Sequence, residues 1–337
     1  MDRFAWQSAR SVAEAASLAN ATVAQAMVGA GDRAVLKAGG IDLLDLMKAR
    51  LLLPGRVVNL REIPGLDAIA VDVAGTRVGA LATLEQVAVH PGLRQSHTAI
   101  ADAAASSGSP QIRHIATMGG NLLQRPRCWY FRSADFHCLR KGGGHCFAIP
   151  GDNRYHAIFD NRLCASVHPS TAATALVALG AAIELVDAEG EKREIRLEDF
   201  FISPDRDVQR ENDLKPHEIL TAVQVPAPPA GARMAHVTIA EKASCDWPLA
   251  DVAALLDLGA DGRCARASIV LGAAAPTPRR AKSAEALLVG QRIDETVAAA
   301  AGRAAIGGAA PLAGNAYKLP LFETAVRRAI LKAVAAG

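Results

Sequence analysis

The sequence predicts an α+β protein of two domains, and three observations along the chain support this prediction. Runs with the alternation of β-strands and stretches with the periodicity of helices occur on both sides of residues 226–231. That segment holds three prolines and a glycine, which is the composition of a linker. Regular patterning is absent over residues 125–162, which predicts a long loop of the kind that has a function or is braced.

In the first half, helices and strands are predicted to alternate. A capping box at residues 11–14 begins an alanine-rich helix. A strand over residues 34–36 leads into a glycine pair, and a helix resumes over residues 43–50 until Pro54 ends it. The remaining expected elements are strands over 56–60, 68–73 and 76–81 and helices after Thr83, over 99–106 and over 170–179.

Beyond the linker, the pattern predicts a second α+β unit. We expect strands over residues 236–239 and 267–271, with a helix over residues 249–256 between them. Three further helical stretches complete the chain, over residues 281–288, 294–305 and 321–336.

Composition excludes several classes of function. The net charge of +3 arises from 37 basic and 34 acidic residues without a dense basic tract, so a nucleic-acid partner is not expected. Membrane insertion is not expected either, because no apolar run approaches the roughly 18 residues of a spanning helix. Residues 1–7 lack the apolar core of a signal peptide. We therefore expect a cytoplasmic chain, or a periplasmic one if a partner subunit carries it through export.

Two glycine-pair corners are candidate sites for a diphosphate. At Gly39 and Gly40 a strand runs into a helix, so backbone N–H groups gather where no side chain blocks close approach. A second corner holds Gly119 and Gly120, preceded by the Thr117 hydroxyl. Each corner alone also fits an ordinary strand–turn–helix connection. Together they could clamp the diphosphate of a dinucleotide from both sides, although no G-x-G-x-x-G or Walker sequence is present.

Four of the six cysteines fall within the irregular stretch, at Cys128, Cys138, Cys146 and Cys164. Four thiolates form a soft ligand set that suits an iron–sulfur cluster or zinc. The intervals of nine, seven and seventeen residues lack the closely spaced pairs of zinc sites and fit a [4Fe–4S] cube better. A set of reduced structural thiols remains the alternative at this point.

The composition around these cysteines is basic. Five cations face a single acid, Asp135, so the loop could offset the negative charge of a cluster. The cations are Arg125, Arg127, Arg132, Arg140 and Lys141. Cys245 and Cys264 lie far from this stretch and are expected in the core. No H-E-x-x-H or G-x-S-x-G pattern indicates hydrolytic chemistry, so these features favour an electron carrier without catalytic residues of its own.

Several motifs resemble one known family in order along the chain. Residues 38–43 are similar to A-G-G-T-[DN]-L, and residues 112–121 to I-R-N-x-A-T-x-G-G-N. Further similar elements lie at residues 167–170, 218–221, 271–281 and 315–318. The chain thus resembles, over nearly its whole length, the FAD-binding (medium) subunit of the molybdenum hydroxylases, which include xanthine dehydrogenase and aldehyde oxidoreductase.

This resemblance implies a fold and a domain organisation. A two-part FAD-binding domain of the PCMH/vanillyl-alcohol-oxidase type would span residues 1–225, with subdomains of about 1–55 and 56–225. A cysteine-rich insertion would occupy residues 122–166. A C-terminal domain like that of the CO dehydrogenase flavoprotein, with an antiparallel sheet and helices, would span residues 231–337.

The resemblance also implies cofactors and their ligands. The residues that would hold FAD are Leu36, Lys37, Ala38, Gly39, Gly40, Ile41, Asp42, Leu43, Thr117, Gly119, Gly120, Asn121 and, near the ring, Leu220. The sequences at residues 127–132 and 151–158 look most like the aldehyde oxidoreductase branch, in which four cysteines bind a [4Fe–4S] cluster. These ligands carry over to Cys128, Cys138, Cys146 and Cys164.

Partners follow from the same resemblance. Substrate would be oxidised at the molybdenum cofactor of a large subunit. Electrons would then reach this chain through the [2Fe–2S] centres of a small subunit, and would leave to an external acceptor. A non-catalytic scaffold, with a cluster- or zinc-stapled loop and little flavin, is the alternative. An autonomous flavin oxidase is a weaker one, since no substrate-handling residues are evident.

The chain departs from the family pattern at the flavin site. Thr171 follows Ser170 where the family has aspartate, and Ile41 replaces the usual threonine. The family's K-x-R-x-R-A-S-Y aligns its last three residues with Ala243-Ser244-Cys245, which puts Thr238, Ala240 and Lys242 at the positions of the lysine and the two arginines. We therefore expect FAD affinity and flavin potential to differ from those of the family.

Overall fold

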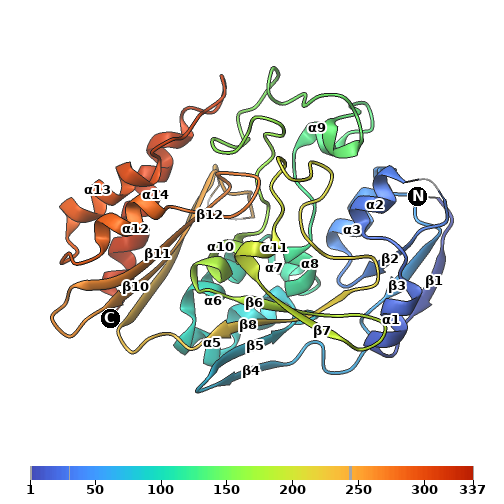
Figure 1. Cartoon of the computed structure of the whole chain (residues 1–337), viewed down its shortest axis with the longest axis horizontal. Coiled ribbons are helices and arrows are strands. Elements are labelled where there is room, and N and C mark those ends of the chain that lie inside the picture. The colour runs from blue at the N-terminus through green and yellow to red at the C-terminus, as the bar shows by residue number, and fades with distance from the viewer. Residues whose placement is uncertain (1, 30, 243–244, 337) are drawn as a thin grey trace.

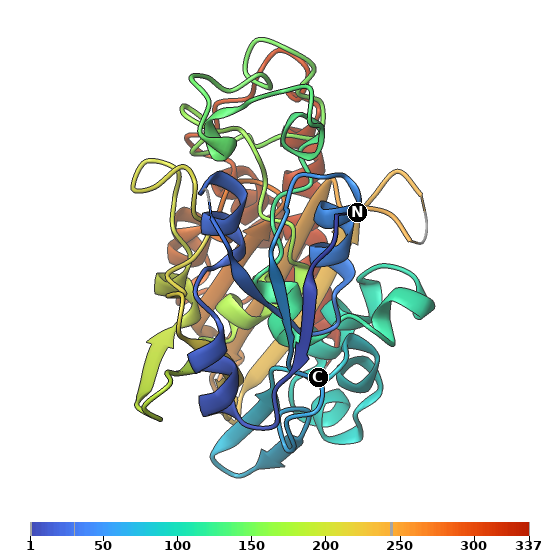
Figure 2. The ribbon, with the colours of Figure 1, turned by 90° about the vertical axis from the view of Figure 1, so that its right-hand side faces the viewer.

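Three β-sheets organise the computed structural model, which describes residues 2–29, 31–242 and 245–336 (Figures 1 and 2). The first sheet is parallel, in the order β1-β3-β2, with strands β1 (Ala5–Ser8), β2 (Ala34–Lys37) and β3 (Arg56–Asn59). Its helices are α1 (Val12–Leu18), α2 (Val23–Val28) and α3 (Ile41–Lys48). Together they form the N-terminal unit drawn in blue in Figure 1.

The second sheet is antiparallel, in the order β4-β5-β8-β6-β7. Its strands are β4 (Ile69–Asp72), β5 (Gly75–Gly79), β6 (Ala182–Val186), β7 (Lys192–Arg196) and β8 (Ile219–Pro226). The accompanying helices are α4 (Leu84–Val89), α5 (Pro91–Ser96), α6 (Thr98–Ser106), α7 (Pro110–Arg113), α8 (Met118–Leu122), α10 (Thr171–Ala178) and α11 (Leu197–Phe200).

The third sheet is antiparallel, in the order β12-β11-β10-β9. Its strands are β9 (Ala232–Ile239), β10 (Ala250–Leu258), β11 (Cys264–Gly272) and β12 (Arg279–Arg280). Helices α12 (Lys282–Leu288), α13 (Glu295–Ala305) and α14 (Lys318–Ala335) follow it. The predicted linker thus joins the second sheet to the third, since β8 ends at Pro226 and β9 begins at Ala232.

The prediction of a helix over residues 249–256 is wrong, because this segment is the central strand β10. Alternate residues of β10 belong to different cores: Ala253 and Leu255 belong to the core that includes α10, whereas Val252 and Ala254 belong to the core that includes α14. A strand buried on both faces is continuously apolar and has no alternation, so its pattern cannot be told from that of a buried helix.

The long loop is irregular, as predicted, apart from the single turns α9 (Trp129–Arg132) and η1 (Leu139–Lys141). Figure 1 shows this loop, in green, at the top of the view, between the N-terminal unit and the C-terminal domain. Asn161 hydrogen-bonds to the carbonyl of Ala310, so the loop is tied to the C-terminal domain. Ala243 and Ser244, part of the aligned A-S-Y element, lie outside the described residues. Within the described part of the chain, no helix is long and apolar enough to cross a membrane.

Candidate flavin and cysteine sites

A cavity of about 500 Å³ lies where the N-terminal unit meets the second sheet. Every residue predicted to hold FAD lines it: Leu36, Lys37, Ala38, Gly39, Gly40, Ile41, Asp42, Leu43, Thr117, Gly119, Gly120, Asn121 and Leu220. They come from the end of β2, the start of α3, the start of α8 and from β8. The two glycine corners, distant in sequence, therefore share one cavity, which from here on is called the large cavity.

The first corner requires both of its glycines. Gly40 has a φ of 88° and caps the N-terminus of α3, and this left-handed conformation strongly favours glycine. A Cβ at Gly39 would overlap the carbonyl oxygen of Ile115, so the two corners pack backbone against backbone. The first turn of α3 leaves N–H groups without partners inside the helix and carries the positive end of its dipole. This corner therefore suits an anionic group such as a diphosphate.

The second corner acts more as a wall. Its helix α8 is capped by the Thr117 hydroxyl, which accepts from the Gly120 N–H at 3.2 Å. The N–H groups of Met118 and Gly119 donate to the carbonyls of Ala82 and Ala80, each at 2.8 Å. These donors are thus already engaged, and the corner contributes shape. A Cβ on Gly120 would meet only the Thr117 hydroxyl, at 3.0 Å, so the absence of a side chain at this position leaves space in the cavity.

Charged groups flank the first corner. The Lys37 ammonium donates to the carbonyl of Ala38 at 3.0 Å and lies 5.4 Å from the ring centre of Trp6. Burial, and to a lesser degree Arg61, lowers the pKa of Lys37. Asp42 accepts from the backbone N–H of Arg125 at 2.9 Å, and its other oxygen pairs with arginines of the cysteine loop. The large cavity and the cysteine loop therefore share a wall.

Several lining residues carry no sequence signal of their own. Residues 106–109, 210–212, 214–216 and 246–248 also line the large cavity. Thr171 also lines it, with its hydroxyl in contact with that of Ser107. Thr238 instead donates to Asp251 in the C-terminal sheet at 2.8 Å.

The prediction that Cys245 and Cys264 belong to the core is half right. Cys264 is buried in β11. Cys245 is exposed on the rim of the large cavity, with a φ of 59°.

A second, small cavity is lined by all four loop cysteines, Cys128, Cys138, Cys146 and Cys164. Within the described residues, no three His, Cys, Asp or Glu side chains are grouped so that they could hold a metal ion. The four thiols thus line one space. We call this space the cysteine cavity.

The cysteines differ in their polar contacts. Cys164 accepts from the Arg140 guanidinium at 3.3 Å and contacts the Ser166 hydroxyl at the same distance. A hydrogen bond from Cys146, aided by Arg140, holds the pKa of Cys164 well below its ordinary value. Cys128 lies 3.1 Å from Nε2 of His156, and burial raises its pKa to about 11. Cys164 therefore lies beside a buried positive charge.

The predicted balance of five cations against Asp135 is wrong in its detail, because acids from outside the loop pair with most of them. Arg127 and Arg132 bind Asp42 and Asp45 of α3. Arg125 and Arg140 bind Glu211. The sequence could not reveal these partners, since they lie 71 to 90 residues away.

The C-terminal domain braces the cysteine loop. The buried ammonium of Lys318 donates to the carbonyls of His156 and Ala273, at 3.1 and 2.6 Å. The Asn315 amide donates to the carbonyls of His156 and Ala157. These contacts fix the backbone of His156, whose ring contacts Cys128.

A third cavity, of about 150 Å³, lies between the other two. It shares Arg127 and Trp247 with the large cavity and Cys128 with the cysteine cavity. Trp129 and Tyr155 also line it, with ring centres 5.6 Å apart. The two candidate cofactor sites are thus neighbours across an aromatic wall.

Comparison with known proteins decides the family. Residues 2–228 match the model for the FAD binding domain in molybdopterin dehydrogenase. The chain belongs to this family of FAD-binding medium subunits. Residues 235–333 match the model for the CO dehydrogenase flavoprotein C-terminal domain, as the resemblance of the last third of the chain implied.

Relatives of this family cover almost the whole chain. The aldehyde oxidoreductase FAD-binding subunit PaoB of Escherichia coli (strain K12) is 34% identical over 301 residues, which are 88% of this chain and 90% of that protein. The carbon monoxide dehydrogenase medium chain of Afipia carboxidovorans is 29% identical over 317 residues, 90% of each chain.

Solved structures agree with this assignment. The structure of reconstituted CO dehydrogenase from Oligotropha carboxidovorans aligns with a TM-score of 0.76 and 25% identity, over 100% of this chain and 99% of that one. The predicted fold class, FAD-binding character and oxidoreductase family are confirmed. The residues around the large cavity also fit FAD, because a glycine corner and a helix N-terminus open into an otherwise largely apolar space.

Proposed function

We propose that this chain is the FAD- and [4Fe–4S]-containing electron-transfer subunit of a molybdenum-dependent oxidoreductase that acts on aldehydes, or on aromatic or heterocyclic compounds. The observation that carries the proposal is that two sites are neighbours. One is the large cavity, lined by the residues predicted to hold FAD, and the other is the cavity lined by four cysteines. The 34% identity to an aldehyde oxidoreductase subunit supports the aldehyde class.

In the large cavity, the residues would share the work of holding FAD. The start of α3, with Gly39 and Gly40, would bind the diphosphate through backbone N–H groups. Thr117, Gly120 and Asn121 would shape the wall along the diphosphate and ribityl chain, and Leu220 would pack near the ring. The bound flavin supplies the redox chemistry, and the chain positions it and excludes water.

In the cysteine cavity, the donor set favours a cube over zinc. A zinc ion needs four donors that converge to about 2.3 Å from one point. A [4Fe–4S] cube spreads its four thiolates farther apart, which suits four cysteines that surround a common space. Arg140 and Lys141 provide positive charge beside the sulfurs, as a cluster with net negative charge requires.

The chain would act within a larger assembly. A large subunit with the molybdenum cofactor would oxidise the substrate, and a small subunit with [2Fe–2S] centres would pass the electrons on. This chain would receive them and release them to an external acceptor. We further propose synthesis in the cytoplasm, with the periplasm as destination where a partner carries the export signal.

Metal and flavin content of the co-purified complex tests the proposal. Complex prepared without oxygen should contain one flavin per copy of this chain. It should also contain about four irons with inorganic sulfide beyond those of the small subunit's [2Fe–2S] centres, plus an EPR signal of a reduced cubane cluster. Zinc in this chain, or no iron and sulfide beyond the [2Fe–2S] centres, would overturn the cluster assignment. A complex without flavin after gentle isolation would instead favour a non-catalytic scaffold, and substrate turnover by this chain alone would favour an autonomous oxidase.

A further inference from the structure

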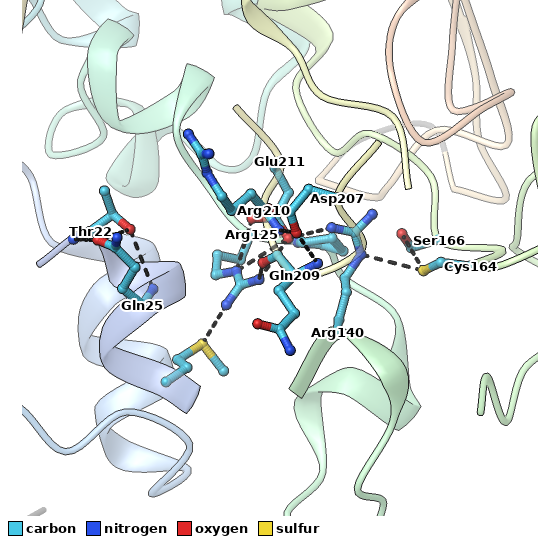
Figure 3. A network of polar contacts seen from close by, with 12 residues as sticks. Thr22, Gln25, Arg125, Arg140, Cys164, Ser166, Asp207, Gln209, Arg210 and Glu211 are labelled. Carbon is cyan, nitrogen blue, oxygen red and sulfur yellow. Dashed lines mark hydrogen bonds and ion pairs between the residues drawn. The ribbon is translucent and has the colours of Figure 1, made fainter. Parts of the chain in front are cut away.

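A buried polar chain connects the large cavity with the cysteine cavity (Figure 3). It runs from Arg125 through Glu211 and Arg140 to Cys164, and we call it the Arg–Glu–Arg chain. Arg125 and Glu211 line the large cavity, whereas Arg140 and Cys164 line the cysteine cavity. Glu211 lies 86 and 71 residues from Arg125 and Arg140 in sequence, so only the fold brings it to them.

The contacts along this chain are short and continuous. Glu211 accepts from Nε and Nη2 of Arg125, at 3.0 and 2.9 Å, in a bidentate pair. The same carboxylate accepts from Nη1 of Arg140 at 2.7 Å, and Nε of Arg140 donates to the Cys164 sulfur at 3.3 Å. Both arginines are 2% exposed and Glu211 is 8% exposed, so water screens none of these charges well.

The charges of the Arg–Glu–Arg chain do not cancel. Two guanidinium groups, which stay protonated in proteins, share one carboxylate. The nearby carboxylate of Asp42 is occupied by Arg127 and Arg132. Burial and the Arg140 charge lower the pKa of His168 to about 3, so this ring is neutral. One positive charge is therefore left over, and the remaining hydrogen bond of Arg140 directs it at Cys164.

We propose that Arg140 positions Cys164 and raises the reduction potential of the cluster there, and that Glu211 ties this effect to the flavin cavity. This inference rests on the proposed function. Its physical basis is that a buried positive charge and an N–H···S hydrogen bond stabilise the more negative, reduced form of a cluster. Because Glu211 also holds Arg125, a change in charge in the large cavity is felt at Cys164 through the shared carboxylate.

The test uses charge changes of opposite sign. Arg140→Met removes the excess positive charge and should lower the midpoint potential of the cluster, measured by EPR-monitored redox titration of the complex. Glu211→Gln removes the opposing negative charge and should raise it. Arg140→Lys keeps the positive charge but lacks the planar guanidinium, so its midpoint potential should lie between those of wild type and Arg140→Met. Arg154→Met, an exposed arginine paired with Asp152 in the same loop, should leave the potential unchanged.

Iron, sulfide and flavin contents are measured alongside, because a merely structural role would change occupancy and not potential. Shifts of opposite sign at unchanged flavin content support the inference. Potentials that stay at the wild-type value, or that move in the same direction in both variants while iron is retained, would overturn it. If Arg140→Met loses its iron, the Arg140→Lys and Glu211→Gln potentials decide. A wild-type complex without iron and sulfide beyond the small subunit's [2Fe–2S] centres overturns the proposed function itself, and the inference with it.

Discussion

The two candidate cofactor sites are built in opposite ways. The large cavity is walled by regular elements, and its critical positions are backbone: a left-handed Gly40, the first turn of α3 and a glycine at the start of α8. The cysteine cavity sits in an irregular loop that side chains from other parts of the chain hold in place. The large cavity is therefore preformed by the folding of regular elements, whereas the cysteine cavity is held by side-chain contacts from distant parts of the chain.

Of the changes considered, loss of one cysteine should have the largest effect, and it should act on the cysteine site alone. Cys146→Ser should remove about four irons per chain, because a cube lacking one of its thiolates is not retained. Flavin content should stay near wild type, since Cys146 does not line the large cavity. Iron analysis and flavin absorbance of the same preparation measure both. The matched control is Cys264→Ser, a buried thiol in β11 whose replacement should keep both cofactors. Equal loss of iron and flavin in Cys146→Ser would mean that the sites are not independent.

Removal of a brace should weaken the cysteine site without abolishing it. Lys318→Met leaves the buried carbonyl of Ala273 without its donor, at a cost of about 1–3 kcal/mol, whereas the carbonyl of His156 keeps the hydrogen bond from Asn315. Iron occupancy should fall partly while flavin occupancy is kept. If Lys318→Met contains as much iron as wild type and loses it at the same rate, the loop needs no brace from α14.

The same lysine gives the fold a pH dependence. Burial lowers the pKa of Lys318 from 10.5 to about 7. Between these values the unfolded chain holds one proton more than the folded chain, so folding becomes more favourable as pH rises from 7, by up to about 1.4 kcal/mol per unit. Below pH 7 both states are protonated and this contribution is constant. Urea unfolding at pH 6 to 9 should show this rise in wild type relative to Lys318→Met; parallel curves would contradict it.

The flavin site should respond to changes that leave the cysteines intact. Gly120→Val places a side chain in the large cavity, because a Cβ there meets only the Thr117 hydroxyl. Flavin occupancy should fall at least several-fold, with iron retained. Gly39→Val is the informative contrast, since its Cβ would overlap the Ile115 backbone and should lower the melting temperature as well. If Gly120→Val unfolds as readily as Gly39→Val, the view of this corner as a cavity wall is incorrect.

The sequence predicts the locally encoded parts of both sites. Glycine pairs at strand–helix corners and a quartet of cysteines in an aperiodic stretch are visible along the chain. The sequence does not reveal the role of Glu211. This residue pairs with Arg125 across 86 residues, and such a distant ion pair leaves no local pattern. It also misassigns β10, since burial on both faces removes the alternation that marks a strand. What depends on long-range contact therefore required the structure.

The smallest expected effect concerns a departure from the family. Thr171→Asp would restore a carboxylate at the start of α10, where the helix dipole favours negative charge. The hydroxyl of Ser107, in contact with Thr171 now, could donate to it. We expect tighter FAD binding by about 1 kcal/mol, roughly fivefold in Kd, by fluorescence titration of flavin-free protein. Thr171→Asn, of equal shape without the charge, is the control and should gain less. Weaker binding in both variants would indicate that the native threonine is fitted to its contact with Ala103, and that the flavin cavity has adapted to the loss of the carboxylate.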